Sequence, residues 1–484
     1  MKASRDIELA LTGRSVLILS DAYAPYISGG AEVSLEAVLI NQPSDWRKKV
    51  VVATFTDKVS RPTLSHSDEM AVLHFPEPRH WPYNTLTRQT FERWERRFHV
   101  VGLDFERLLR IREVLTTNRG LRARKVMLHS LSNPSGGIVT DEFFDSRDIR
   151  VKWISAVCRK MAALDQLIAD NTRSILIGAQ LLKKFRAESS VAIVRDNRFH
   201  CVRPTQSRLV GGKLCKSCNF QCAREDASNA VGERVENLKY AHKVRSDSLN
   251  SYSKVVVTSF ELQRHVSPIL TPKQMVIRIP NTVGNYYNDV SKYLPAEDRK
   301  KRLLIIGMLN ENKGQLEFLK AAEDWLQARR DVCIVLCGKG DRITRQILKF
   351  VSKAGLDQQV ELLGFQPRQN IFEQIRRSSL VLAPTRWAEP FGRVPLEAGI
   401  AERAIVAFGV GGLNESIIHG YTGFLSRPGD YRQFLNHIEQ LLEDDELRLK
   451  MEQNAKQWIS RTYCREHVSG LFSEHVFSTR SGLT

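Results

Sequence analysis

Long apolar runs are absent from this chain of 484 residues. No stretch of about 18 apolar residues occurs, the length that a membrane-spanning helix needs, so no such helix is predicted. The first residues lack the apolar centre of a secretory signal, because Leu9-Ala-Leu-Thr is too short to serve. No internal repeat or low-complexity tract stands out, so solenoid and fibrous architectures are excluded. We therefore expect a cytoplasmic protein, and its length suits two domains.

Acidic residues are scarce relative to basic ones, since 54 Asp and Glu face 72 Lys and Arg, giving a net charge of +18. Residues 88–125 are rich in arginine and carry apolar side chains at spacings of three and four, which predicts an amphipathic basic helix or helix pair. Three interpretations stay open: packing into its own domain with a solvated basic face, an anionic membrane surface, or nucleic acid. No nucleic-acid recognition motif accompanies the charge, so we expect no such partner.

The most informative segment is Pro384-Thr-Arg-Trp-Ala-Glu389-Pro-Phe-Gly392-Arg-Val-Pro-Leu-Glu397-Ala. Glu389 and Glu397 stand eight positions apart, and the Pro-Phe-Gly turn between them predicts a helix start. Carboxylates accept hydrogen bonds from hydroxyls, in which sugars are rich. A helix start offers free N–H groups and a positive dipole end to phosphate. Eight helical residues would span about 12 Å, which suits the two hydroxyl-bearing ends of a nucleotide sugar.

Three more segments fit the same interpretation. Residues 303–314 predict a buried parallel strand, a turn and a helix start, and Lys313 would lie at the C-terminal edge of that strand. Open α/β sheets bind ligands at this edge, where an ammonium can neutralise charge on a leaving diphosphate. Residues 332–340 and 406–415 predict two further strands that end in glycine-rich turns. Glycine lets backbone N–H groups approach phosphate closely.

Together these segments resemble the donor-binding half of retaining glycosyltransferases with the GT-B fold, family 4, also called glycosyltransferase group 1. The resemblance covers most of residues 300–430, in the family's order, and includes Val360 to Gly364 and Thr422-Gly-Phe-Leu425. It implies an α/β protein of two Rossmann-like, doubly wound parallel-sheet domains facing a cleft. The implied boundaries are 1–283 for the acceptor-side domain, 284–457 for the nucleotide-sugar domain, and 458–484 for a C-terminal helix that crosses back.

The resemblance also implies roles for individual residues. Glu397 would hold the ribose hydroxyls, and Glu389 the sugar hydroxyls together with the N–H groups of Phe391 and Gly392. Lys313 would bind the departing diphosphate, so catalysis needs no metal or other cofactor. Asp170 completes the catalytic set, because it ends the predicted strand at 164–171, where the family often has histidine. The residues implied for donor binding are Gly29, Gly30, Gly307, Gly338, Phe391, Gly392, Arg393, Glu397, Gly412 and Glu415.

The chain departs from the family pattern at three places. Met308 stands where an arginine usually follows the glycine, so one phosphate-facing cation is missing or is supplied by Arg386 or Arg393. Asp170 replaces the histidine of the acceptor-side strand, and Arg195-Asp196 replaces a histidine-aspartate pair. These changes leave the expected fold intact and bear on rate, acceptor and activity.

Cysteine use is uneven. Cys201 is followed by Cys215-Lys-Ser-Cys218-Asn-Phe-Gln-Cys222 in an insert near 201–222 that has few apolar residues to bury. Four thiolates suit tetrahedral zinc, which would order the loop as a structural site with no part in sugar transfer. The alternatives are reduced thiols without metal, a disulfide pair or an iron–sulfur cluster.

The sequence therefore predicts a retaining glycosyltransferase that moves a hexose-type group from a nucleotide diphosphate sugar to a glycan or lipid-linked acceptor. Polysaccharide or glycoconjugate biosynthesis is the expected setting, with attachment at the inner membrane face as an option that the basic first domain suggests. Three alternatives remain: a sugar-nucleotide epimerase with the same fold, a non-catalytic protein that binds the donor, and a basic nucleic-acid-binding protein, whose affinity would fall steeply with salt.

Overall fold

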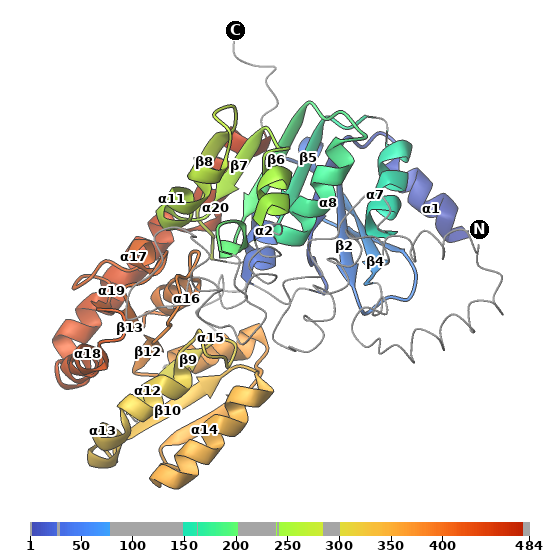
Figure 1. Cartoon of the computed structure of the whole chain (residues 1–484). Helices are drawn as coiled ribbons and strands as arrows, with labels where there is room; N and C mark the ends of the chain where they lie inside the picture. The colour runs from blue at the N-terminus through green and yellow to red at the C-terminus, as the bar shows by residue number, and fades with distance from the viewer. Residues whose placement is uncertain are drawn as a thin grey trace.

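The structure is a computed structural model, and it describes residues 2–26, 30–77, 149–161, 163–201, 239, 242–283 and 301–477. These residues form two sheets flanked by helices (Figure 1). One has eight strands in the order β3-β4-β2-β1-β5-β6-β7-β8, and the other has six in the order β11-β10-β9-β12-β13-β14. All neighbouring strands run parallel except β3 and β4. The predicted fold class, two parallel-sheet α/β domains of the GT-B type, is confirmed.

The first sheet consists of β1 (Val16–Ser20), β2 (Val50–Thr56), β3 (Thr63–Ser67), β4 (Met70–Pro76), β5 (Gln166–Asp170), β6 (Ser189–Val194), β7 (Lys254–Val257) and β8 (Met275–Arg278). Its helices are α1 (Lys2–Leu11), α2 (Gly30–Ile40), α3 (Ser44–Arg47), α7 (Ile149–Lys160), α8 (Thr172–Leu182) and α11 (Phe260–Val266), with 3₁₀ turns at Asn197–Phe199 and Ser267–Ile269. Every residue of β1, β2 and β5 is buried, since helices cover both faces of a parallel sheet. Their Val-, Ile- and Leu-rich runs are therefore continuous, and Ile18 of β1 lies between Val52 and Ile168.

The second sheet consists of β9 (Lys301–Ile306), β10 (Val332–Cys337), β11 (Val360–Gly364), β12 (Leu380–Ala383), β13 (Ala404–Phe408) and β14 (Phe424–Ser426). Its helices are α12 (Gln315–Ala321), α13 (Glu323–Ala328), α14 (Asp341–Ala354), α15 (Arg368–Arg376), α16 (Val394–Ile400), α17 (Leu413–Ser416), α18 (Tyr431–Glu443) and α19 (Asp445–Thr462). From β9 the chain builds outward to β10 and β11, and then returns to place β12 on the other side of β9. The order of strands thus reverses between β9 and β12, and ligands bind at such a switch point.

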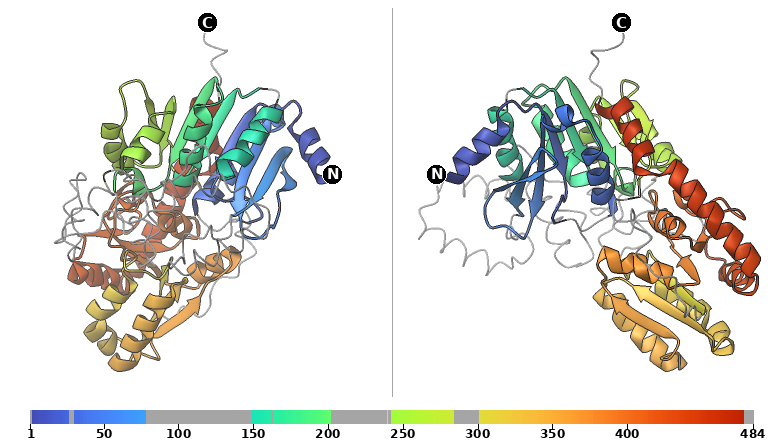
Figure 2. Two further views of the ribbon diagram at one scale, coloured as in Figure 1. Left: turned by 45° about the vertical axis from the view of Figure 1, so that its right-hand side comes forward. Right: turned by 180° about the vertical axis from the view of Figure 1, so that it is seen from behind.

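The end of the described chain packs against the first sheet, as the view from behind shows (Figure 2). It comprises α20 (Arg465–Phe472) and a π-helical turn at Ser473–Phe477. Apolar side chains of this segment, Phe472 and Val476 among them, share a core with Ile18 and Val52. The Gln166 side-chain amide donates to the Val476 carbonyl at 2.6 Å. The chain therefore crosses between the two sheets a second time.

Several predicted features lie outside the described residues. These are the basic segment at 88–125, Gly29, and the insert cysteines Cys215, Cys218 and Cys222. Among the helices that the structure does describe, none combines the length and the apolar character needed to cross a membrane.

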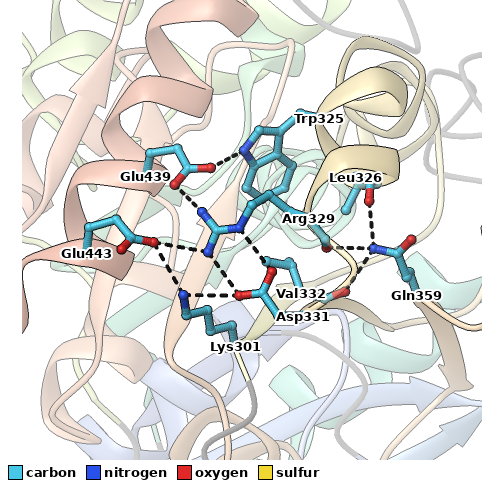
Figure 3. A network of polar contacts seen from close by, with 9 residues as sticks. All are labelled: Lys301, Trp325, Leu326, Arg329, Asp331, Val332, Gln359, Glu439 and Glu443. Atoms are coloured by element: carbon cyan, nitrogen blue, oxygen red, sulfur yellow. Dashed lines mark hydrogen bonds and ion pairs between the residues drawn. The ribbon is translucent and has the colours of Figure 1, made fainter.

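A polar network closes the second sheet at the edge where its strands begin (Figure 3). Arg329 donates to Asp331 at 3.0 and 3.1 Å, and it also pairs with Glu439 and Glu443 of α18. Hydrogen bonding to Arg329 lowers the pKa of Asp331, and the same bond raises the pKa of Arg329. Beside them, the buried Gln359 amide donates to the carbonyls of Leu326, Arg329 and Val332 at 2.8, 2.9 and 3.2 Å. These bonds tie α13, α18 and the starts of two strands together.

We expect Gln359→Leu to destabilise the protein, because three carbonyls would lose their shared donor inside the fold. Unmet buried polar groups cost about 1–3 kcal/mol each, and partial relaxation should bring the sum to about 2–4 kcal/mol. Chemical denaturation measures this. Arg330→Ala is the matched control, because Arg330 is exposed and reaches only the Gln359 oxygen at 3.2 Å. Equal unfolding midpoints for both variants would contradict the role of Gln359.

Candidate functional site

Lys313 and Glu389 meet at the switch point of the second sheet. Lys313 follows the turn after β9, and Glu389 lies in the segment that joins β12 to α16. The Lys313 ammonium forms an ion pair with Oε1 of Glu389, whose residue is only 7% exposed. The Trp387 indole N–H donates to the same oxygen at 2.8 Å, and the Thr385 hydroxyl lies 3.4 Å away. A buried carboxylate needs such partners, since an unpaired charge would pay a large desolvation cost.

The turn after β9 and the segment between β12 and α16 meet because their backbones come into contact at Gly314. This glycine has φ +71°, and a Cβ there would lie 2.1 Å from the Pro384 carbonyl oxygen. The backbone N–H of Arg386 donates to the Asn312 carbonyl at 2.6 Å, and the Thr385 hydroxyl donates to the same carbonyl at 3.0 Å. Only glycine permits this approach, which brings Lys313 within reach of Glu389.

A second close approach fixes Glu389 from the other side. The backbone N–H of Gly412 donates to the Glu389 carbonyl at 2.7 Å. A Cβ on Gly412 would lie 2.4 Å from the Cα of Phe391, so no larger residue fits without moving backbone. The glycine-rich turn predicted after β13 therefore packs against the Glu389 loop. The turns after β9 and β10 also join, since Gly307 donates to the Cys337 carbonyl and Leu309 to that of Lys339, both at 2.9 Å.

Glu397 lies one turn into α16, the helix that the Pro-Phe-Gly turn was predicted to open. Arg393 directly precedes this helix, and its guanidinium lies 3.5 Å from the Glu397 carboxylate. Phe391 is buried and packs edge-on against Tyr463, with ring centroids 5.5 Å apart. The segment 389–397 thus carries a carboxylate at each end and a helix start between them.

Two arginines, Arg386 and Arg393, could supply the positive charge that Met308 lacks. Met308 is 58% exposed, at the position where an arginine was expected. Arg386 faces α12, where it pairs with Glu317 at 3.0 Å. Arg393 stands beside the helix start and Glu397, so it is better placed than Arg386 to supply a second positive charge there.

Asp170 lies in a buried ion pair with Arg195. It ends β5, as the sequence predicted, but it is fully buried and its carboxylate accepts a hydrogen bond from the Arg195 guanidinium at 2.5 Å. Arg195 also donates to the side-chain oxygen of Asn281 at 2.5 Å. A buried aspartate requires a cation, and Arg195 supplies it, while the catalytic role of Asp170 stays a prediction.

Glu415 connects the two domains. Its carboxylate accepts the backbone N–H groups of Phe260 and Glu261, at 2.7 and 3.3 Å, across the boundary between the two sheets. Arg278 of β8 lies 3.8 Å away. Burial raises the pKa of Glu415. The acid therefore caps α11 of the first domain in this structure, and its role in donor binding stays a prediction.

Gly30 begins α2 in the first domain. Cys201 is buried directly after the 3₁₀ turn at 197–199. Within the described ranges no cluster of three or more His, Cys, Asp or Glu residues could hold a metal ion. The predicted four-cysteine site falls mostly outside those ranges and stays a prediction.

Sequence reasoning missed three residues around Glu389. Thr385 and Trp387 both reach its Oε1, and their alternation at positions 385, 387 and 389 is a signal that an extended segment would place them on one side. Asn197 was not found, because it comes from the first domain and lies 191 positions from its partner, Ala388. No local pattern encodes that contact.

Solved structures share this architecture. HepE of Anabaena, solved with UDP, superposes with a TM-score of 0.61 at 17% identity and covers 96% of this chain and 100% of that chain. Sucrose-phosphate synthase of Thermosynechococcus elongatus gives a TM-score of 0.64 at 15% identity, covering 96% and 99%. Identities this low show the fold alone.

Sequence comparisons also find similar proteins. Residues 288–458 match the family described as glycosyl transferases group 1. The alpha-D-kanosaminyltransferase of Streptomyces kanamyceticus is 29% identical over 215 residues, 42% of this chain and 55% of the relative. A lipopolysaccharide 1,2-N-acetylglucosaminetransferase of Salmonella typhimurium is 28% identical over 265 residues, 51% and 68% of the two chains. The match to the first of these relatives spans only about half of its length.

We expect Gly412→Ala to lower the melting temperature, because its Cβ would displace the backbone of Phe391. Overpacking of this kind costs about 1–3 kcal/mol. Gly470→Ala in α20 is the control, since a Cβ there meets nothing within 4 Å. Thermal unfolding of the two variants measures this difference in melting temperature. A Gly412→Ala protein that melts with the wild type would show that the two loops do not touch as described.

Proposed function

We propose that this protein transfers a sugar from a nucleotide diphosphate sugar to a glycan or lipid-linked acceptor, with retention of anomeric configuration. The observation that carries the proposal is the meeting of Lys313 and Glu389 at the switch point, next to the helix start that bears Glu397. One cation, one hydroxyl-binding carboxylate and a second carboxylate beyond the helix start match the three parts of such a donor. Polysaccharide or glycoconjugate biosynthesis is the proposed setting.

The comparisons support a nucleotide-sugar donor. HepE of Anabaena has been solved with UDP, with UDP and glucose, and with UDP-glucose. The relatives named above are sugar transferases by name, and the Salmonella protein acts on lipopolysaccharide. We propose that this chain uses the same class of donor. For the acceptor we propose a broader class than the relatives' names give, namely a glycan or a lipid-linked glycan. Retention rests on the resemblance of residues 389–397 to the pattern of retaining enzymes.

The ion pair has a direct chemical meaning under this proposal. When the bond between the anomeric carbon and the diphosphate oxygen breaks, negative charge grows on the diphosphate. The Lys313 ammonium can turn from Glu389 toward that charge, which stabilises the departing group in a poorly solvated site. Glu389 is then left to accept hydrogen bonds from sugar hydroxyls. Catalysis by positioning and charge in this way needs no metal or other cofactor, and we keep that as part of the proposal.

Three further parts of the proposal concern the location of the protein and its partners. We place the protein in the cytoplasm and, through the basic segment at 88–125, at an anionic membrane face. Nucleic acid is not a proposed partner. Vesicles with and without anionic lipid, mixed with the protein and sedimented at moderate salt, test the membrane part.

Two measurements test the activity itself. A thermal-shift panel of nucleotide sugars identifies the donor, because a ligand that binds only the folded state raises the melting temperature. Incubation of that donor with candidate acceptors, followed by NMR of the new linkage, reads both transfer and configuration. Lys313→Ala serves as the inactive control. Conversion of the donor to an isomeric nucleotide sugar would indicate an epimerase, and binding without turnover would indicate a non-catalytic protein.

Glu397→Ala and Glu389→Ala should lose function in different ways, because they hold opposite ends of the donor. Loss of Glu397 should weaken binding of the free nucleoside diphosphate by about 1.5–3 kcal/mol, the value of a charged hydrogen bond. Loss of Glu389 should spare that binding and suppress transfer. Isothermal titration calorimetry and initial rates measure the two effects. Unchanged nucleotide affinity in Glu397→Ala would refute the assignment.

We also propose that Cys201, Cys215, Cys218 and Cys222 bind one structural zinc ion. The described part of the site fits, because Cys201 is buried and its neighbour His200 is a buried imidazole whose ring nitrogens have no hydrogen-bond partner among the described residues. Basic residues of the insert would offset the charge of four thiolates.

Elemental analysis of protein purified without added metal should find about one zinc per chain. Removal by chelation should lower the melting temperature, since metal binding and loop ordering are coupled, and should leave nucleotide affinity unchanged. The control is Cys464→Ser, a cysteine far along the chain in the segment before α20. Four freely titratable thiols in the folded, metal-free protein would refute the site.

A further inference from the structure

Glu389 sits between two peptide groups that are each held by a hydrogen bond. The carbonyl of Ala388, on its N-terminal side, accepts the side-chain amide of Asn197 at 2.6 Å. Its own carbonyl, on the C-terminal side, accepts the backbone N–H of Gly412 at 2.7 Å. With both neighbouring peptide planes fixed, the direction of the Cα–Cβ bond of Glu389 is fixed as well. One of the two bonds comes from the other domain.

The Asn197 donor is itself firmly placed. It is 3% exposed and begins the 3₁₀ turn after β6. Arg195 is bound to the buried Asp170 and to Asn281. Directly before Asn197, the Asp196 carboxylate accepts the Thr172 hydroxyl at 3.0 and 3.1 Å. The segment therefore presents the amide from a rigid edge of the first sheet, where β5 and β6 end.

Glu415 forms a second contact between the domains, and this contact is also connected to the loop that carries Glu389. It lies in α17, the short helix that begins directly after Gly412. Its carboxylate holds the first N–H groups of α11 in the first domain, and its own carbonyl accepts the Tyr463 hydroxyl at 2.9 Å. A shift of the first domain would therefore act on both peptide bonds around Glu389, on one through Asn197 and on the other through Glu415 and Gly412.

We propose that the first domain positions the Glu389 carboxylate of the second domain, with Asn197 as the principal positioning residue and Glu415 as a second link. The inference rests on the proposed function, because sugar transfer is the reaction that the positioned carboxylate would serve. Donor binding by the second domain and productive placement of Glu389 are then separable. The free nucleotide binds without the Asn197 contact, whereas transfer requires it. Misplacement of the carboxylate should lower the rate of transfer more than it lowers the affinity for the nucleotide.

The test uses Asn197→Asp, which has the same shape and cannot donate to the Ala388 carbonyl. Asn454→Asp is the matched control, because Asn454 also donates its amide to a backbone carbonyl, that of Tyr421 at 3.1 Å, away from the site. We expect Asn197→Asp to lower kcat at least tenfold, with nucleoside diphosphate affinity within twofold of the wild type. The control should match the wild type in both. An unchanged kcat, or an equal loss of nucleotide affinity, would overturn the proposal.

A readout that needs no turnover separates this inference from the proposed function. Trp387 donates to Glu389, so a fluorinated Trp387, assigned in ¹⁹F NMR through Trp387→Phe, reports the placement of the loop. Its signal should shift or broaden in Asn197→Asp and stay in place in Asn454→Asp. A wild-type protein that transfers no sugar counts against the proposed function alone, and the ¹⁹F signal then decides this inference. An unmoved signal in Asn197→Asp overturns it.

The second link is tested with Glu415→Gln and Glu415→Ala. Glutamine keeps an oxygen that can accept the α11 N–H groups and loses only the charge near Arg278, which lies 3.8 Å away. We expect the rate to fall severalfold in Glu415→Ala and to be largely restored in Glu415→Gln, with nucleotide affinity constant in both. Equal rates for Glu415→Ala and the wild type would remove Glu415 from the proposal.

Discussion

The close backbone contact between the Glu389 loop and its two neighbouring loops is the constraint on which the site depends. Gly314 on one side and Gly412 on the other leave no room for a Cβ, because the carbonyl of Pro384 and the Cα of Phe391 occupy that space. Side chains could not bridge such a gap with equal precision, since each would add rotamers. Three loops from three different strand ends thus act as one rigid unit, and the ion pair is a consequence of that packing.

Electrostatics then decides what this unit can do. Glu389 is nearly buried, so its charge must be compensated, and Lys313 supplies that compensation in the structure. Under the proposed function, an arriving diphosphate would compete for the same ammonium in surroundings of low dielectric, where the exchange of one anion for another carries a large energy. Lys313 is the cation paired with Glu389 in the structure, and Arg393, next to Glu397, adds a second positive charge near the helix start.

Much of the fold could be predicted, because its signals are local. The continuous apolar runs at 303–306, 332–337 and 404–408 are strands, as expected for a parallel sheet covered on both faces. The site was predicted less completely. The motif placed Lys313 and Glu389 at one sheet edge, but their direct pairing depends on a glycine approach whose geometry no sequence pattern states. Contacts between residues far apart in the chain could not be predicted for the same reason.

The two departures from the family on the acceptor side become a single change when seen in three dimensions. Asp170 and Arg195 stand 25 positions apart in sequence and 2.5 Å apart in the fold. A buried aspartate at the end of β5 would be strongly destabilising by itself, and so would a buried arginine after β6, whereas the pair is tolerated. The pair also anchors the turn that begins at Asn197. The replaced residues of the first domain therefore contribute to the site indirectly, by fixing the segment that reaches across to the loop of the second domain.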